Sequence, residues 1–216
     1  MGTSAPDRPG PVGVFGGTFD PVHFGHLRVA LDALELLGLA QVRMVPLARA
    51  VHRDQPETPA ELRLAMLEAA LAGRDDLVAD AVELRRGGPS YTVDTLATLK
   101  ERLPGRTLCL MIGGDAFNGF ADWRDPRGIL DLANLVVLQR PAQAPPSDPR
   151  LLALLEAHQV DRLDPERPAG QIVPVAVTQL DIASSEIRHR IAAGRSADFL
   201  VPARVLELIA RHRLYR

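Results

Sequence analysis

The chain has 216 residues, with 25 Lys+Arg against 27 Asp+Glu and a formal net charge of −2. This near-neutral charge argues against a nucleic-acid coat protein or a polybasic membrane anchor, and no apolar run approaches the roughly 18 residues of a membrane span. Cys109 is the only cysteine, which excludes disulfides within the chain and cysteine-rich zinc sites and favours a reducing, cytoplasmic setting. Because Lys100 is the only lysine, any anion site must be built from arginine, histidine or backbone N–H groups.

Short β-branched runs alternate with segments of helical periodicity along the chain. The predicted strands cover Val12–Gly16, Gln41–Leu47, Leu77–Leu84, Thr107–Ile112, Asn134–Gln139 and Ile172–Val177. The predicted helices cover Phe24–Leu37, Ala60–Ala72, Thr92–Arg102, Ser185–Ala193 and Pro202–Arg211. This order is typical of an α/β protein. It predicts a Rossmann-like, doubly wound parallel sheet of about six strands, with helices on both faces and a small helical C-terminal segment.

The proline-containing stretches between these elements do not mark a domain boundary. Residues 141–150 and 164–170 are predicted loops, and residues 1–11, which contain three prolines, are predicted to form a disordered tail. Residues 12–216 are therefore expected to form a single domain. Because ligands bind at the carboxyl ends of the strands in sheets of this kind, the chemically unusual residues should lie just after strands.

The most unusual segment, GGTFDPVHFGH, runs from Gly16 to His26 directly after the first predicted strand. Its glycines allow a ligand to approach the backbone closely. His23 and His26 share one face at the start of a helix, where N–H groups and partial positive charge favour phosphate. Two histidines without a third ligand do not make a zinc site, and the segment lacks the G-x-G-x-x-G fingerprint of dehydrogenases. It therefore predicts a phosphate site of another kind.

The same segment resembles the H-x-G-H nucleotidyltransferase superfamily, and its residue sequence is similar to that of bacterial nicotinate-nucleotide adenylyltransferases. The resemblance covers nearly the whole chain, from about Val12 to Arg216. Further similarities to this family are Gly88–Thr92, Ile112–Asp115 with Trp123, Arg140–Pro141, Ile182–Arg188 and the ending Leu214–Arg216. The motifs after the strands lie where the rule for parallel sheets places ligand-binding residues.

The resemblance implies a reaction in NAD biosynthesis. The AMP group of ATP would be transferred to the 5′-phosphate of nicotinate mononucleotide, giving deamido-NAD and pyrophosphate. Mg²⁺ would be bound through the ATP phosphates, with no metal ligand from the protein. The implied partners are ATP and nicotinate mononucleotide, without nucleic acid or a membrane. The sequence does not fix the oligomeric state, for which a homodimer is one candidate.

The resemblance also assigns roles residue by residue. His23 and His26 are the implied catalytic donors. The residues implied in ATP binding are Gly16, Gly17, Thr18, Phe19, Gly113, Asp115, Ser184, Ser185 and Arg188. The residues implied in mononucleotide binding are Tyr91, Thr92, Trp123, His52, Arg53 and Arg140. Thr92, Ser184 and Ser185 are expected to cap helices, while Trp123 as a loop anchor and Asp115 as an N-cap stay open as alternatives to direct ligand contacts.

The sequence departs from the family pattern at two places. The usual P-P-H-K after the second strand reads Ala50-Val51-His52-Arg53, so this loop is expected to be less rigid and to present arginine instead of lysine. In the last motif, Ala183 replaces a serine. Two other functions stay open: a sister adenylyltransferase acting on nicotinamide mononucleotide or phosphopantetheine, and a non-catalytic nucleotide sensor of the same fold. The retained pair of histidines speaks against the sensor.

Overall fold

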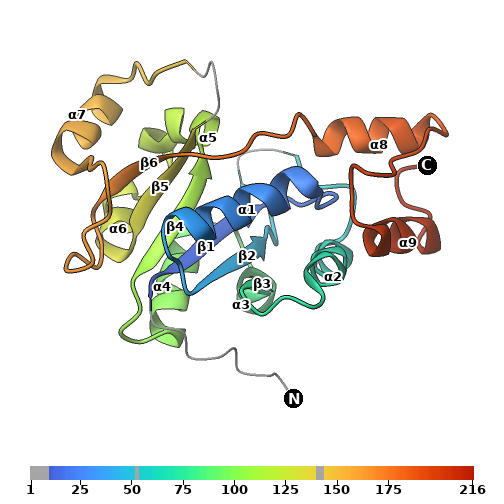
Figure 1. Ribbon diagram of the computed structural model, residues 1–216, viewed down its shortest axis with the longest axis horizontal. Coiled ribbons are helices and arrows are strands. Elements are labelled where there is room, and N and C mark those ends of the chain that lie inside the picture. The colour runs from blue at the N-terminus through green and yellow to red at the C-terminus, as the bar shows by residue number, and fades with distance from the viewer. Residues whose placement is uncertain (1–9, 52–53, 140–143) are drawn as a thin grey trace.

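The computed structural model describes residues 10–51, 54–139 and 144–216. Within these ranges, strands alternate with helices (Figure 1). The strands are β1 (Val12–Gly17), β2 (Gln41–Pro46), β3 (Leu77–Ala79), β4 (Leu108–Gly113), β5 (Asn134–Gln139) and β6 (Ile172–Ala176). The helices are α1 (Phe24–Leu36), α2 (Ala60–Leu71), α3 (Val82–Arg86), α4 (Thr92–Arg102), α5 (Gly114–Asn118), α6 (Pro126–Leu132), α7 (Pro149–His158), α8 (Ser184–Ala192) and α9 (Ala203–Arg211), with a 3₁₀ turn η1 (Phe120–Asp122).

The strands form one parallel sheet in the order β3-β2-β1-β4-β5-β6. β1 lies inside the sheet, where Val12 pairs with Gln41 of β2 on one side and with Leu108 of β4 on the other. The strand order reverses beside β1, because the chain first winds outward to β3 and then returns to β4 on the other side. The predicted doubly wound parallel sheet is confirmed, and the crevice beyond the carboxyl ends of β1 and β4 is where such a sheet binds its ligand.

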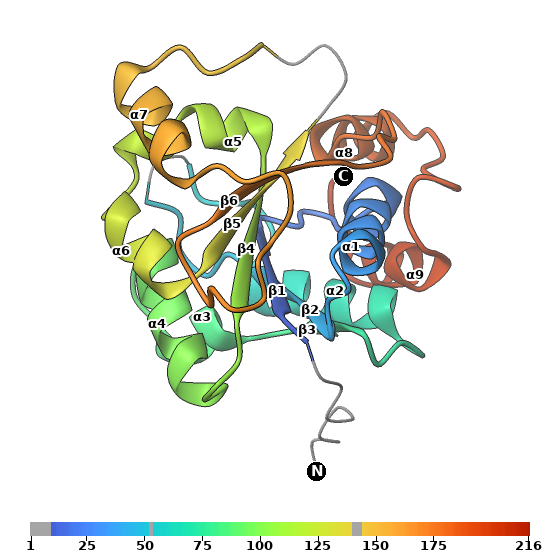
Figure 2. The same ribbon diagram turned by 60° about the vertical axis from the view of Figure 1, so that its left-hand side comes forward.

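Helices cover both faces of the sheet (Figure 2): α1, α2, α8 and α9 lie on one face, and α3 to α7 lie on the other. β4 contributes to both layers, because Cys109 and Met111 pack on the first side and Leu108 and Leu110 on the second. A strand covered on both faces is apolar throughout, as its sequence predicts. Cys109 is fully buried, and burial raises the pKa of its thiol to about 12, so it acts as a small core residue.

The predicted third strand, Leu77–Leu84, is wrong in its second half. β3 ends at Ala79, and α3 begins at Val82. The chain turns at Asp80, whose buried carboxylate pairs with Arg43 at 2.6 Å and with Arg102 at 3.1 Å. A short apolar run does not distinguish a strand from a buried helical turn, and here Val82 packs in the same core layer as α4.

Besides α3, three further helices, α5, α6 and α7, were not predicted. Two of them begin at the proline of an Asp-Pro pair, with the aspartate as N-cap: Asp125 accepts a hydrogen bond from the N–H of Gly128 (2.9 Å), and Asp148 accepts one from the N–H of Arg150 (2.8 Å). An aspartate cap followed by proline is an ordinary start signal that the sequence contains. The predicted loop over residues 141–150 is therefore wrong at its end, because α7 begins at Pro149.

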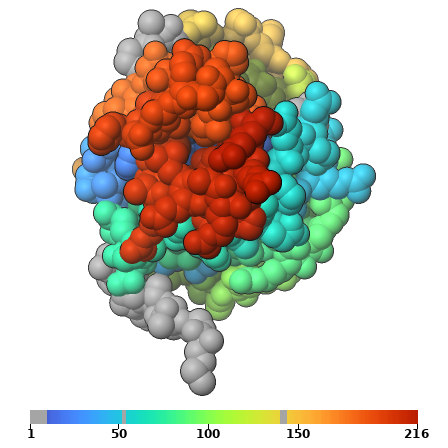
Figure 3. Space-filling view, turned by 90° about the vertical axis from the view of Figure 1, so that its right-hand side faces the viewer, coloured from blue at the N-terminus to red at the C-terminus, as the bar shows by residue number. Residues whose placement is uncertain are grey.

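The predicted small helical C-terminal segment is confirmed by α8 and α9. α9 packs against α2, and Figure 3 shows the C-terminal residues in red beside the teal surface of α2. At the other end of the chain, the backbone oxygen of Pro11 accepts a hydrogen bond from the N–H of Ala40 at 2.8 Å, while residues 1–9 of the predicted tail lie outside the described residues. None of the helices in the described ranges combines the length and apolar character needed to cross a membrane.

Candidate active site

The end of β1 opens onto a cavity of about 410 Å³, which Gly16 and Gly17 line. Among the described residues, a Cβ added to Gly16 would meet nothing within 4 Å, so the chain leaves space for a ligand there. The buried hydroxyl of Thr18 has no hydrogen-bond partner among these residues. Phe19 follows with φ of 49° and packs its ring edge-on against His26, with centroids 5.0 Å apart. The loop thus presents open backbone and one unsatisfied hydroxyl.

The two histidines stack on each other at the start of α1, with ring centroids 3.7 Å apart, which confirms their predicted placement. The backbone N–H of His23 donates to Nδ1 of His26 at 3.4 Å. A neutral His26 therefore carries its proton on Nε2. His23 is only 5% exposed, and burial lowers its pKa to about 4, so it is neutral near pH 7. Its Nδ1 has no hydrogen-bond partner within the described ranges.

The start of α8 contacts the same loop. The hydroxyl of Ser184 donates to the backbone oxygen of Pro21 at 3.0 Å, and Nη1 of Arg188 donates to the backbone oxygen of Asp20 at 2.8 Å. These two bonds join the first and last motifs of the sequence, which are more than 150 positions apart. The N-terminus of α8 therefore lies beside the loop that precedes α1.

The predicted helix caps at Thr92, Ser184 and Ser185 are wrong. The N-cap of α8 is Ala183 and that of α4 is Tyr91, and no side chain from either cap position hydrogen-bonds to its helix. The hydroxyl of Ser184 is used on a neighbouring loop, and Ser185 is exposed in the first turn. Because no capping side chain occupies their first-turn N–H groups, both helix starts keep their capacity to bind an anion.

Arg63 of α2 is a buried residue that supports the site, and the sequence did not predict this role. It is 1% exposed, and its guanidinium donates to the backbone oxygens of Thr18 (2.7 Å), Leu47 (2.6 Å) and Thr58 (3.0 Å). These acceptors satisfy much of the hydrogen-bonding capacity of a charged group that is costly to bury. Arg63 thereby joins the loop after β1 to the segment after β2. An arginine within a helix normally indicates an exposed position, so no sequence signal pointed to this role.

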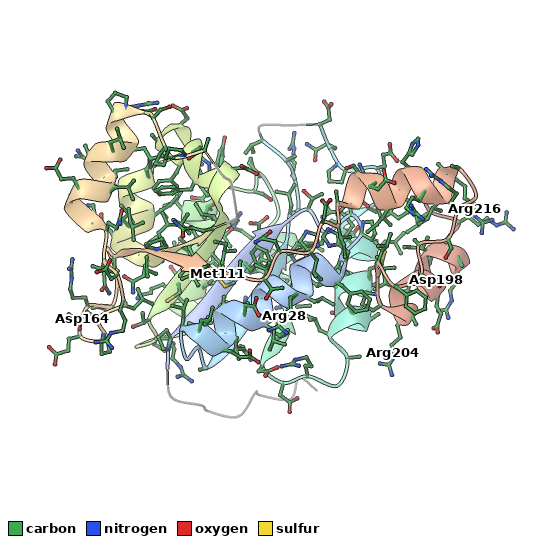
Figure 4. All side chains as sticks on the ribbon, turned by 45° about the horizontal axis from the view of Figure 1, so that its top comes forward. Arg28, Met111, Asp164, Asp198, Arg204 and Arg216 are labelled. Carbon is green, nitrogen blue, oxygen red and sulfur yellow. The ribbon has the colours of Figure 1, made fainter. Side chains whose placement is uncertain are left out.

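The chain ending also reaches the loop after β1. The hydroxyl of Tyr215 donates to Oδ1 of Asp20 at 2.5 Å and accepts a hydrogen bond from the hydroxyl of Thr58 at 3.1 Å. Burial, together with the neighbouring Asp20 carboxylate, raises the pKa of Tyr215 well above its usual range. Figure 4 labels Arg216 at this end of the molecule, beside α8 and α9. We call the contacts of Tyr215 with Asp20 and Thr58 the C-terminal clamp.

Three of the residues predicted to bind the mononucleotide line the cavity: Tyr91, Thr92 and Trp123. They come from the start of α4 and from the end of η1, so distant parts of the chain meet across the glycines of β1. Trp123 is half-buried and packs at a tilt on Phe120, with ring centroids 5.5 Å apart. Its ring is thus anchored on one side while it lines the cavity.

Four polar or charged residues of the cavity wall were not predicted: Glu83, Ser90, Thr95 and Arg124. Ser90 and Arg124 adjoin Tyr91 and Trp123 in the sequence, so their neighbours could have pointed to them. Glu83 could not be identified in this way, because its segment was assigned to a strand. The carboxylate of Glu83 accepts a hydrogen bond from the hydroxyl of Thr95 at 2.8 Å, and it is 8% exposed.

The backbone after β2 forms another part of the wall and is held by side chains from elsewhere. The N–H of Ala48 donates to Oε2 of Glu83 (3.2 Å) and to the hydroxyl of Ser90 (3.1 Å). The N–H of Ala50 donates to Oε1 of Gln55 (3.0 Å), whose amide nitrogen donates back to the Ala50 oxygen (2.9 Å). These bonds fix the backbone at Ala48, just before the altered family motif, and at Ala50, its first residue.

The remaining predicted residues are less well placed. Gly113 ends β4 and is the N-cap of α5, so the alternative in which Asp115 caps this segment is wrong. Asp115 is exposed in the first turn of α5. His52, Arg53 and Arg140 lie outside the described residues. Within the described ranges, no three His, Cys, Asp or Glu side chains gather in a way that could hold a metal ion.

Known proteins resemble this chain in sequence and fold. Residues 14–190 match the cytidylyltransferase-like family. A probable nicotinate-nucleotide adenylyltransferase of Methylococcus capsulatus is 46% identical over 94% of this chain and 99% of its own length, and one of Hydrogenovibrio crunogenus is 42% identical over 95% and 97%. The solved nicotinic acid mononucleotide adenylyltransferase of Plasmodium falciparum, complexed with NaAD, shares the fold with a TM-score of 0.69 at 17% identity, over 96% of this chain and 98% of its own. The chain therefore belongs to the nicotinate-nucleotide adenylyltransferase family, within the cytidylyltransferase-like proteins.

Proposed function

We propose that the protein transfers the AMP group of ATP to the 5′-phosphate of nicotinate mononucleotide, forming deamido-NAD and pyrophosphate in NAD biosynthesis. One observation carries this proposal beyond family membership. The loop with the stacked histidines, held against the start of α8, adjoins a cavity lined by Tyr91, Thr92 and Trp123. A triphosphate and a pyridine nucleotide can thus be held side by side at the carboxyl ends of β1 and β4.

The reaction needs no nucleophile from the protein. A phosphate oxygen of the mononucleotide attacks the α-phosphorus of ATP, a new P–O bond forms, and the bond to the bridging oxygen breaks as pyrophosphate leaves. The protein must align two anions and stabilise the charge that develops on the α-phosphate. Nε2–H of His26 is our candidate donor, together with His23, the hydroxyl of Thr18 and the N-terminus of α1.

His23 acts here as a neutral hydrogen-bonding group. Its pKa of about 4 means that it is not a cation near pH 7 before substrate binds. A neutral imidazole still supplies one N–H donor. The positive charge near the phosphates comes instead from Arg188, whose Nη1 is fixed on the Asp20 carbonyl at 2.8 Å and whose guanidinium has further N–H donors.

The cavity supplies the mononucleotide side of the proposed site. The flat face of Trp123 suits a pyridine ring, and the first-turn N–H groups of α4, beginning at Thr92, suit the carboxylate of that ring. On the ATP side, Gly113 and Asp115 lie at the end of β4 next to β1. We propose contacts of Asp115 with the ATP ribose or with the region of the metal.

Mg²⁺ fits this arrangement as a companion of the ATP phosphates. Because it keeps several waters and binds substrate phosphates, it needs only one or two protein oxygens. The exposed carboxylate of Asp115 is the described residue that would hold it, in addition to the ATP phosphates. When bound, the ion neutralises charge on the triphosphate.

The test is pyrophosphate release from ATP, with nicotinate mononucleotide, nicotinamide mononucleotide and phosphopantetheine compared side by side. We expect the highest kcat/KM with nicotinate mononucleotide. A higher value with one of the other acceptors would support a sister adenylyltransferase. Nucleotide binding without pyrophosphate release from any acceptor would support the sensor. As part of this proposal we place the enzyme in the cytoplasm, and a homodimer stays a candidate that light scattering tests.

A further inference from the structure

The cavity that we assign to the mononucleotide has an uneven distribution of charge. Its described lining contains one acidic side chain, Glu83, and one basic side chain, Arg124, while most of the other lining residues are apolar. Nicotinate and nicotinamide rings have nearly the same shape and differ in charge, because one bears a carboxylate and the other a carboxamide. The two charged residues are therefore the side chains that could distinguish these rings electrostatically.

Glu83 is already used by the protein. Its carboxylate accepts hydrogen bonds from the hydroxyl of Thr95 at 2.8 Å and from the N–H of Ala48 at 3.2 Å, and it is 8% exposed. These bonds hold two parts of the wall together and engage both carboxylate oxygens. Glu83 is thus a structural element of the cavity, and its negative charge disfavours an anionic ring unless a cation compensates for it.

Arg124 is in a position to compensate. Its guanidinium carbon lies 4.4 Å from the centroid of the Tyr91 ring, over the face of a side chain that also lines the cavity. Its ion pair with Asp94 is long, at 3.4 Å, and the two side chains are 55% and 40% exposed. In the described part of the chain, Asp94 is the only hydrogen-bonding partner of the Arg124 guanidinium. N–H donors of the planar Arg124 guanidinium are therefore available to a ligand.

We infer that the guanidinium of Arg124 is a specificity-determining group that favours the acid over the amide form of the pyridine mononucleotide. A carboxylate accepts two parallel N–H bonds from a guanidinium and gains from its charge. A carboxamide accepts only through its oxygen, and its NH₂ group is repelled by the same fork. The inference rests on the proposed function, because it concerns the ring of that substrate.

The experiment compares kcat/KM for nicotinate and nicotinamide mononucleotide in the wild-type enzyme and in Arg124→Gln. We expect the acid-to-amide ratio of kcat/KM to fall about tenfold in the variant, the lower end of the range for a charge-assisted hydrogen bond at a partly exposed site. The loss should lie in the nicotinate value. The control is Arg127→Gln, which removes the same charge from an exposed residue three positions away that does not line the cavity.

A second readout is the effect of salt. Raising the ionic strength should lower the acid-to-amide ratio of the wild-type enzyme and should change it little in Arg124→Gln. Equal losses for both substrates, or an unchanged ratio, would overturn the inference and leave Arg124 as packing for Tyr91. Equilibrium binding of both mononucleotides is measured in parallel. A wild-type protein that binds them without turnover would refute the proposed function, and the binding ratio in Arg124→Gln would still decide on Arg124.

Discussion

The hydroxyl of Tyr215 lies 2.5 Å from Oδ1 of Asp20, although 195 positions separate the two residues in the chain. The backbone oxygen of the same aspartate accepts a hydrogen bond from Arg188 at 2.8 Å. Asp20 is therefore held by both the C-terminal clamp and α8. Since α8 and the loop after β1 face the same phosphates in the proposed reaction, these contacts set the distance between the two anion-binding segments.

Tyr215→Phe removes only the hydroxyl of this clamp. We expect kcat to fall about tenfold, the equivalent of roughly 1.4 kcal/mol for one hydrogen bond to a charged group, with a smaller change in KM for the mononucleotide. Steady-state kinetics with both substrates checks this. The control is Arg216→Ala, at the neighbouring exposed residue. A lower Tm with unchanged kcat would show that the clamp stabilises the fold without positioning the loop.

Arg63→Met should destabilise the protein strongly. The change leaves the backbone oxygens of Thr18, Leu47 and Thr58 without the donor that now satisfies them. Each unsatisfied buried acceptor costs about 1–3 kcal/mol, so we expect a loss of at least 3 kcal/mol in urea unfolding. Arg74→Met is the matched control, because Arg74 pairs with Asp76 at 2.8 Å on the surface and should lose less than about 1 kcal/mol. Similar losses in both variants would contradict the role of Arg63.

The buried imidazole of His23 predicts a pH-dependent stability. Its pKa is lowered from 6.5 to about 4 in the folded protein by burial, so the unfolded chain binds the proton more readily between these pH values. The free energy of unfolding should therefore be highest above pH 6.5 and should fall as the pH decreases toward 4, by roughly 3 kcal/mol from this group. Chemical unfolding across this range should give a flatter profile for His23→Gln. The exposed His189 provides the control, since His189→Gln should keep the wild-type slope.

The tautomer of His26 predicts a difference between two similar variants. Because Nδ1 accepts from the His23 N–H, the proposed donor is Nε2. Glutamine places an amide nitrogen near the position of Nε2, whereas asparagine places one near Nδ1. We expect kcat to fall about 100- to 1,000-fold in His26→Asn and clearly less in His26→Gln. Single-turnover measurements check this, and equal losses in the two variants would exclude Nε2 as the catalytic donor.

Trp123 should act mainly on the mononucleotide. Removing its ring by Trp123→Ala should raise KM for nicotinate mononucleotide about tenfold, since an aromatic contact contributes on the order of 1 kcal/mol, and should affect KM for ATP much less. Trp123→Phe should restore part of the loss. Equal effects on both substrates, together with a lower Tm, would instead support the role of a loop anchor on Phe120.

Much of the fold follows from local patterns in the sequence. The central strands are long, apolar and bounded by glycine or turn residues, so β4 and β5 were predicted to within a residue. The end of β3 was missed because the apolar run of Leu77–Leu84 is equally compatible with a strand and a helix, and the ion pairs of Asp80 decided between them. Those pairs join residues that are distant in the chain, and no local pattern contains them.

In the candidate site, too, local sequence patterns predict some residues, while residues that act through distant contacts escape prediction. Residues within continuous motifs, such as Gly16, His23 and Tyr91, could be predicted because their chemistry and spacing are recognisable within one segment. Arg63 and Glu83 could not be predicted, because each acts through backbone groups of other loops. A charged side chain normally indicates a surface position, and only the fold shows that these two are enclosed.

The bonds that Glu83, Ser90 and Gln55 make to the backbone after β2 bear on how this protein could diverge from its relatives. The family pattern has prolines where this chain has Ala50 and Val51. Here side chains from outside the substituted positions hold the backbone through hydrogen bonds to main-chain groups. Nearly all residue types have the same main-chain groups. The side chains at Ala50 and Val51 are therefore not needed to shape the backbone, and these two positions can accept other residue types.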